Sequence, residues 1–149
     1  MSQPPKPSSA LPGILAFAAV EIALYLTYFA HEARFHWFTH FYVGGSVALL
    51  IMAAVARRIG RPVPWPLLWP LLGHILAMFP DFLFQAGIAH RRWMDIFLAH
   101  LSSHFIPGRN WTWYAIWLTC IAIYLSSSNT RERTERELSA DTPALPLTG

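Results

Sequence analysis

Charged residues are scarce in this chain. Only 13% of its 149 residues are Asp, Glu, Lys or Arg, whereas 54% are hydrophobic. A soluble domain carries about a quarter charged residues, because it must cover its surface against water. The apolar residues here also come in long blocks, and the mean hydropathy is +0.36. This composition argues against a soluble domain and indicates a chain whose solvent is lipid.

Cysteine is nearly absent as well. Cys120 is the single cysteine and lies inside an apolar block, which excludes a disulfide framework. The net charge of +3 rests mainly on arginines at the ends of the apolar blocks. This distribution is typical of topology signals, whereas a nucleic-acid surface would gather arginines along one soluble face. We therefore expect membrane lipids around the chain and no nucleic-acid partner.

Four apolar blocks predict the fold class, an all-α integral membrane bundle of four transmembrane helices. The predicted spans are residues 11–30, 41–56, 65–88 and 111–127, and tryptophans mark several block ends, where indole favours the headgroup zone. Residues 93–106 are too short and polar to span and predict an additional interfacial or re-entrant helix. The polar, proline-containing ends, 1–10 and 128–149, predict disordered tails.

Arginine placement also predicts the orientation. With both termini in the cytoplasm, seven of the 11 Lys and Arg residues lie on the inner side, and the positive-inside rule favours that arrangement.

Histidines are the unusual feature of this membrane chain. Four crossings place the first and third connections on the same side of the membrane, whichever side that is. These two connections carry six of the seven histidines, namely His31, His36, His40, His90, His100 and His104. The parity of the spans therefore gathers them at one membrane face.

Two pairs of these histidines have metal-ligand spacing. His36 and His40 are four residues apart, as are His100 and His104. On a helix, both members of such a pair lie on one face about a turn apart and can bind one metal ion together. Bundle packing can bring the two pairs into a four-nitrogen site or part of a dinuclear one. The alternative is that they are interfacial histidines bonded to headgroups, water and carbonyls.

Three ionisable residues fall inside the apolar blocks, where a charge costs at least about 2.5–3.5 kcal/mol at the bilayer centre. Asp81 lies toward the histidine-bearing end of its span, and Pro80 predicts a kink beside it. Asp81 is therefore the carboxylate that we expect as a metal ligand or general base. Glu21 and His74 lie at similar depth and predict a hydrogen-bonded pair between the first and third spans.

Asp95 lies in the predicted interfacial helix. Its carboxylate is placed to orient a ligating histidine through the second ring nitrogen, or it is a plain acidic group near the start of a helix. Gly44 and Gly45 in the second span predict close helix packing.

Several short motifs appear in a familiar order. They are Thr39-His40-Phe-Tyr-Val-Gly44, then Pro80-Asp81, then His90-Arg91 with a later histidine-rich helix. In this order they resemble the predicted membrane-bound, metal-dependent hydrolases of bacteria, some of them under SOS control. That family has a T-H-x-x-x-G start, a P-D motif after an apolar helix and an H-R…H-S segment. The resemblance covers roughly Phe38 to His104, and Phe82-Leu-Phe84 departs from it where the family has a further acid and histidine.

The resemblance implies a metal site and a location. It marks His40, Asp81, His90 and one of His100 and His104 as metal-site residues, and it implies the bacterial inner membrane. Together with His36 from the spacing argument, these six residues are the predicted metal ligands, with Asp81 and His104 as the predicted catalytic groups.

The resulting functional hypothesis is a metal-dependent hydrolase at the membrane face, acting on a lipid or another amphiphile. Zinc suits mixed nitrogen and oxygen ligands, and iron and manganese fit them too. One alternative is a non-catalytic membrane adaptor or assembly subunit with interfacial histidines. Another is a di-iron hydroxylase or desaturase, which is disfavoured because the sequence has no His-His pair. A haem-binding bundle would need a deep histidine partner for His74 in another span.

Overall fold

The computed structural model describes residues 10–27, 33–100 and 102–140, and every regular element in these ranges is a helix. Side chains are described at 10–27, 36–98, 100, 103 and 105–129. The elements in chain order are α1 (Leu11–Thr27), α2 (Ala33–Ile59), α3 (Leu68–Ala77), α4 (Phe79–Gln85), α5 (Arg92–Ile96), the 3-10 turns η1 (Phe97–Ala99) and η2 (Ser102–Phe105), and α6 (Asn110–Ala140). The predicted all-α class is confirmed.

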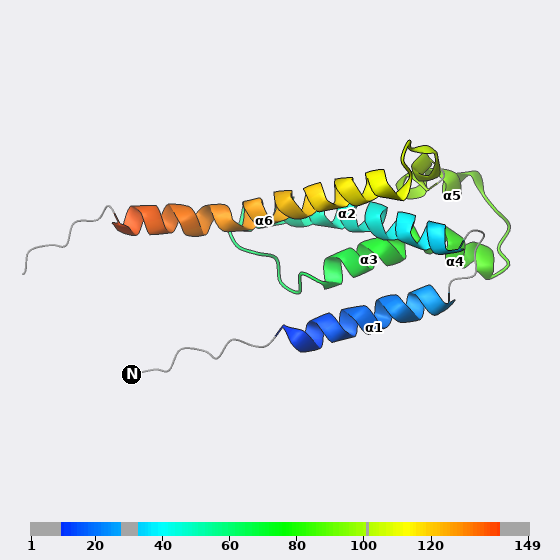
Figure 1. Cartoon of the computed structure of the whole chain (residues 1–149), viewed down its shortest axis with the longest axis horizontal. Coiled ribbons are helices and arrows are strands. Elements are labelled where there is room, and N and C mark those ends of the chain that lie inside the picture. The colour runs from blue at the N-terminus through cyan, green and yellow to red at the C-terminus, as the bar shows by residue number, and fades with distance from the viewer. Residues whose placement is uncertain (1–9, 28–32, 101, 141–149) are drawn as a thin grey trace, which may run out of the picture.

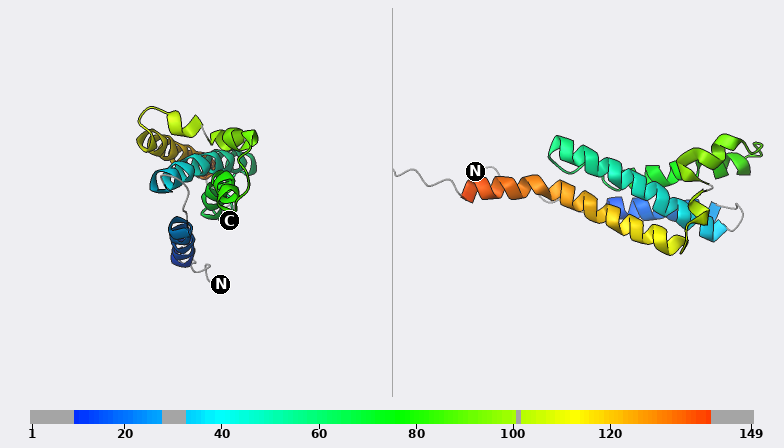
Figure 2. Two further views of the ribbon diagram at one scale, coloured as in Figure 1. Left: turned by 90° about the vertical axis from the view of Figure 1, so that its right-hand side faces the viewer. Right: turned by 90° about the horizontal axis from the view of Figure 1, so that it is seen from above.

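Helix α2 lies at the centre of the bundle (Figures 1 and 2), and it packs along both α3 and α6. Its small and flexible apolar residues Met52, Ala53 and Ala56 form a buried cluster with Cys120 and Tyr124 of α6. Small side chains let the two helix backbones approach closely.

Glycines set the crossing of α2 and α3. A Cβ atom added to Gly44 would overlap the backbone carbonyl of Gly73, and one added to Gly73 would overlap that of Gly44. A Cβ atom added to Gly45 would lie 3.0 Å from the indole nitrogen of Trp117 on α6. The predicted role of Gly44 and Gly45 in close packing is therefore confirmed.

The third apolar block is broken into two helices. α3 ends at Ala77, and α4 begins at Phe79 with Pro80 in its first turn, where a missing backbone N–H does no harm. The predicted kink beside Asp81 is confirmed. The block also begins its helix later than residue 65, because the preceding stretch carries Pro62, Pro64 and Pro66, and Trp65 has a left-handed φ of 53°.

The prediction of one continuous interfacial helix over residues 93–106 is wrong. The chain forms α5, η1 and η2 there, three short pieces instead of one helix. Phe97 is extended, with ψ at 116°, and Leu98 has a left-handed φ of 47°, so the helical hydrogen-bond ladder stops after Ile96. The composition of this stretch carried no sign of that break.

Helix α6 continues through Ala140, so the disordered tail predicted from residue 128 is wrong over 128–140. The sequence there alternates arginine and glutamate with opposite charges four residues apart, such as Arg131 and Glu135, or Glu132 and Arg136. This spacing stabilises a helix without any apolar face. The rest of that predicted tail, residues 141–149, lies outside the described residues, as do residues 1–9 at the other end.

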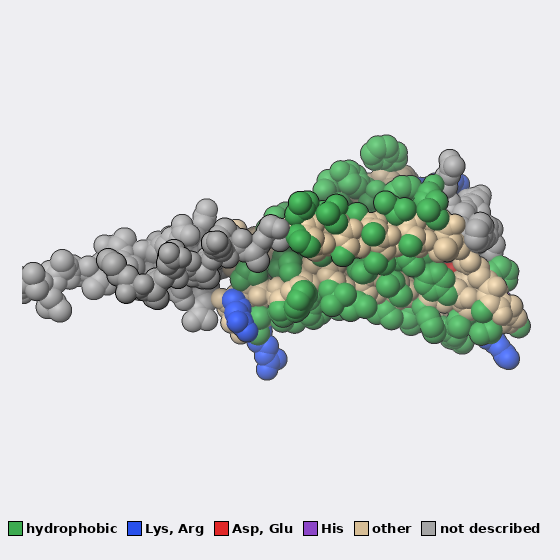
Figure 3. All heavy atoms as spheres, turned by 90° about the horizontal axis from the view of Figure 1, so that it is seen from below, with side chains coloured by type: hydrophobic (Ala, Val, Ile, Leu, Met, Phe, Trp, Pro, Cys, Tyr) green, Lys and Arg blue, Asp and Glu red, His purple; other side chains and the backbone are tan. Residues whose placement is uncertain are grey.

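One helix in the described part of the chain is long and apolar enough to cross a membrane, the stretch His36–Ile59 within α2, with a mean hydropathy of 1.7. α1 and α3 are apolar but shorter. The face in Figure 3 is nevertheless apolar over most of its described length, with basic side chains gathered toward its two ends. α1 lies along the side of the bundle and buries a single residue, Glu21.

Candidate metal centre

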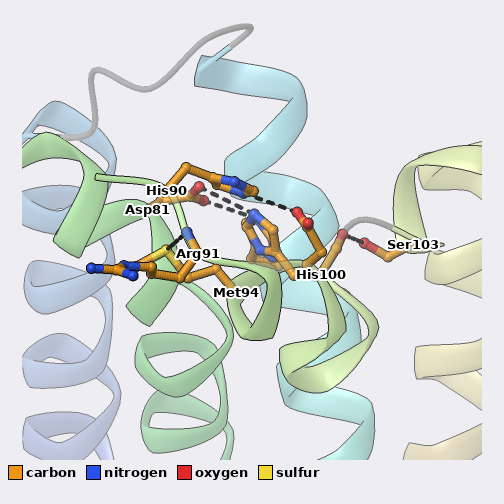
Figure 4. A network of polar contacts seen from close by, with 8 residues as sticks. Asp81, His90, Arg91, Met94, His100 and Ser103 are labelled. Atoms are coloured by element: carbon orange, nitrogen blue, oxygen red, sulfur yellow. Dashed lines mark hydrogen bonds and ion pairs between the residues drawn. The ribbon is translucent and has the colours of Figure 1, made fainter. Parts of the chain in front are cut away.

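Three potential metal ligands meet at one end of the bundle. His40 comes from α2, Asp81 from the first turn of α4, and His100 from the stretch between η1 and η2. Figure 4 shows Asp81 and His100 pointing toward each other. The Nε2 atom of His40 lies 3.0 Å from Asp81 Oδ2, and the Nε2 atom of His100 lies 3.3 Å from Asp81 Oδ1. Each carboxylate oxygen therefore faces a different imidazole.

The break between α3 and α4 is what positions Asp81. In an unbroken helix His74 and Asp81, seven residues apart, would share one face. Because the helix restarts at Phe79, Asp81 faces His40 and His100, while His74 faces α1. The proline that ends one helix thus separates two buried polar sites.

The centre is buried. His40 and Asp81 are 1% and 4% exposed, and the His100 side chain is 13% exposed. The rings of His40 and His100 stack with centroids 4.7 Å apart and planes within 5°. Buried polar groups of this kind are retained only when they are paired or coordinate a metal.

The donor set suits a divalent metal ion. One ligand atom from each of His40, Asp81 and His100 lies within 4.8 Å of the other two. Two imidazole nitrogens with one carboxylate oxygen form a common three-ligand catalytic set for zinc, which leaves a fourth position for water or substrate. The structure thus places a group that can hold a metal ion at this end of the bundle.

His36 lies against the same group. It is buried, and its ring stacks on those of His40 and His100, with centroids 5.6 Å and 6.3 Å away. The predicted His36–His40 pair therefore does lie on one face of a helix.

His90 lies apart from this group. Its Nε2 atom is 2.9 Å from Asp95 Oδ1, its side chain is 55% exposed, and it is not among the described ligand atoms that cluster. Asp95 lies in the first turn of α5, as the plain acidic reading expected, and it pairs with this exposed histidine and not with one of the clustered ligands. The side chain of His104, the other predicted catalytic group, lies outside the described residues.

Hydrogen bonds from residues that were not predicted as ligands surround the centre, and of these residues only Thr39 appeared in a sequence motif. The Ser103 hydroxyl donates to the His100 carbonyl at 2.8 Å, and the indole N–H of Trp113 donates to the Ser103 carbonyl at 2.9 Å. The Thr39 hydroxyl donates to the Asn110 side-chain oxygen at 2.6 Å. None of these residue types has a spacing that signals a ligand, so only the folded chain identifies them.

A second buried pair joins α1 to α3. Nδ1 of His74 lies 2.8 Å from Glu21 Oε2, and both side chains are buried. The rings of Trp37 and Phe41 meet the His74 imidazole edge-on, at centroid distances of 5.0 Å and 5.3 Å. The predicted Glu21–His74 pair is confirmed.

Comparison with known proteins adds no relative. No protein-family model, no curated protein and no solved structure matches the chain. The resemblance to the bacterial membrane hydrolases therefore rests on the short motifs alone.

Proposed function

We propose that this chain is a membrane-embedded, metal-dependent hydrolase that acts at the membrane face on a lipid or another amphiphile. The observation that carries the proposal is the buried group of His40, Asp81 and His100, which has the donor atoms and the proximity of a metal site. Burying a carboxylate costs free energy unless it is paired or coordinates a metal, and a divalent ion held by Asp81 and both histidines would offset that cost.

Zinc is the proposed metal, with iron and manganese as the other ions that fit these donors. His40, Asp81 and His100 would hold it, and His36 is the nearest further imidazole on the same helix face. When bound, such an ion polarises a substrate carbonyl or phosphoryl group and lowers the pKa of coordinated water toward neutrality.

The membrane setting supports the proposed substrate class. Large apolar side chains are exposed along several helices, among them Leu15 on α1, Leu50 on α2 and Leu72 on α3. We propose four crossings, through α1, α2, the α3–α4 pair and α6, in the bacterial inner membrane with both termini in the cytoplasm. A centre at the end of such a bundle meets molecules that concentrate in the membrane, so lipids and amphiphiles are the proposed substrates.

The test is metal content and esterase activity of the full chain purified in detergent. We expect stoichiometric zinc by mass spectrometry and zinc-dependent hydrolysis of p-nitrophenyl octanoate or bis-p-nitrophenyl phosphate, both lost in Asp81→Asn. A folded protein that binds no zinc, iron or manganese would overturn the proposal and favour the adaptor. Bound metal without hydrolysis of any such ester would leave a metal-binding protein and remove the hydrolase.

A further inference from the structure

The first turns of α6 contribute no ligand to the metal centre, yet they contact the chain beside two of the ligands. Asn110 is the first residue of α6, and Trp113 lies one turn further along. From these contacts we propose that Trp113, acting through Ser103, is a positioning residue that sets the geometry of His100 in the metal centre. The inference rests on the proposed metal site and names residues that fix the position of one of its ligands.

His100 needs such support because no regular helix carries it. It follows η1, a single 3-10 turn that contains the left-handed residue Leu98. His40 and Asp81, in contrast, are carried by α-helices. The His100 N–H donates to the Phe97 carbonyl at 2.9 Å, but the segment has no further helical ladder to hold it. A metal site demands placement of its ligands within about 0.5 Å, so contacts from other elements are needed.

A chain of two hydrogen bonds supplies that placement. The Ser103 hydroxyl is bonded to the carbonyl of His100 itself, and Ser103 is 1% exposed. The carbonyl of Ser103 in turn accepts from the Trp113 indole. The backbone of the ligand is thereby tied to α6, the longest helix in the described chain.

The second ligand helix is tied to the same turns. Thr39 precedes His40 on α2, is fully buried and donates to Asn110. Both histidine-bearing segments are therefore anchored on the start of α6, which fixes their separation. This arrangement explains how rings from distant parts of the sequence come to stack 4.7 Å apart.

The experiment is a cobalt and zinc titration of the metal-stripped full chain in detergent. Trp113→Phe keeps an aromatic ring and removes the N–H, so we expect metal affinity to fall about 10–100-fold, as for other residues that orient a ligand. The visible Co²⁺ spectrum should change, because it reports ligand geometry. Trp111→Phe is the matched control, since Trp111 is 80% exposed, and it should match the wild type in both measurements.

Ser103→Ala is the second variant, because it removes only the hydroxyl next to His100, and it should change the Co²⁺ spectrum in the same direction. Wild-type affinity and spectrum in both variants would overturn the inference while leaving the hydrolase intact. A loss of metal binding only in proportion to the loss of folded protein would also overturn it, as a purely structural role. Bound metal without esterase activity would remove the hydrolase and leave the positioning role standing.

Discussion

Asp81 joins the two histidines of the centre, since each of its oxygens faces a different imidazole. It is also the only acidic residue in the clustered group of described ligands. A divalent ion bound by His40 and His100 alone would lack an anionic ligand in a buried setting. Removing the charge of Asp81 should therefore lower the metal affinity more than removing a residue that only orients a ligand.

We predict that Asp81→Asn weakens zinc binding by more than about 100-fold, beyond the range typical of orienting residues. The amide keeps the volume of the carboxylate, so circular dichroism should show an unchanged helix content. Competition with a chromophoric chelator measures the affinity. His90→Ala is the control, because His90 is exposed and paired with Asp95, and it should retain wild-type affinity. Equal losses in the two variants would place His90 in the centre and contradict the structure.

Glu21 has a different role, as the buried partner of His74. We predict that Glu21→Ala destabilises the protein by about 1–3 kcal/mol, because it leaves a buried imidazole nitrogen unpaired. Glu21→Gln keeps an oxygen acceptor, so this variant should lose less stability than Glu21→Ala. Denaturation in detergent measures both, with Ile22→Ala as the exposed neighbour that should change little. Unchanged zinc affinity in all three variants is expected, and a loss confined to Glu21 variants would link the two sites.

Much of the site at this scale follows from the sequence. The predicted span parity places His40 and His100 at one face, similar depth pairs Glu21 with His74, and Pro80 marks the turn that redirects Asp81. That His100 and not His90 joins Asp81 could not be predicted, because His100 follows residues 97–98, whose backbone leaves the helical conformation. A leucine in the left-handed region has no sequence signal, since that conformation favours glycine.

Helix α2 organises the elements, because it contacts α3 at the glycine crossing and α6 along the apolar cluster. Its apolar composition made it predictable, but the predicted span of residues 41–56 was too short. α2 begins at Ala33 and includes His36 and His40, which the sequence had placed in the preceding connection. Two breaks in the helices were only half predictable. Pro80 signals the break before α4, whereas the break after α5 has no signal in the sequence. Helix α6 beyond residue 127 was missed because charge pairing, not hydrophobicity, stabilises it.

We predict that Gly44→Ala disrupts the α2–α3 crossing. The added Cβ atom would overlap the Gly73 carbonyl, so the backbones of α2 and α3 would have to move apart. Overpacking of this kind typically costs about 1–3 kcal/mol. Gly13→Ala is the control, because nothing lies within 4 Å of an added Cβ atom there. Thermal unfolding in detergent should show a lower melting temperature for Gly44→Ala only. Equal melting temperatures in the two variants would refute the close contact between α2 and α3.

The described helices expose many large apolar side chains, and this surface favours the proposed lipid-embedded bundle over a soluble one. Leu11, Leu15 and Leu26 on α1 are each more than half exposed, although α1 has no polar face other than Glu21. The hydrophobic effect drives such a helix out of water, either into lipid or against a partner. Lipid is consistent with the basic side chains at the two ends of the surface in Figure 3.

Topology tests this reading directly. The four proposed crossings would put both termini on one side, and the arginines at 57, 58 and 61 favour the cytoplasm as that side. We predict a fluorescent C-terminal GFP fusion and an inactive C-terminal alkaline phosphatase fusion. A phosphatase fused after residue 60 should be inactive too, whereas one fused after residue 90 should be active. An active phosphatase at the C-terminus would mean an odd number of crossings between it and the cytoplasmic connection. If the α3–α4 pair were the segment that fails to cross, the phosphatase fused after residue 90 would be inactive, and the connection that carries His90 and His100 would no longer share a face with His36 and His40. The metal centre would then have to be assembled from opposite sides of the membrane.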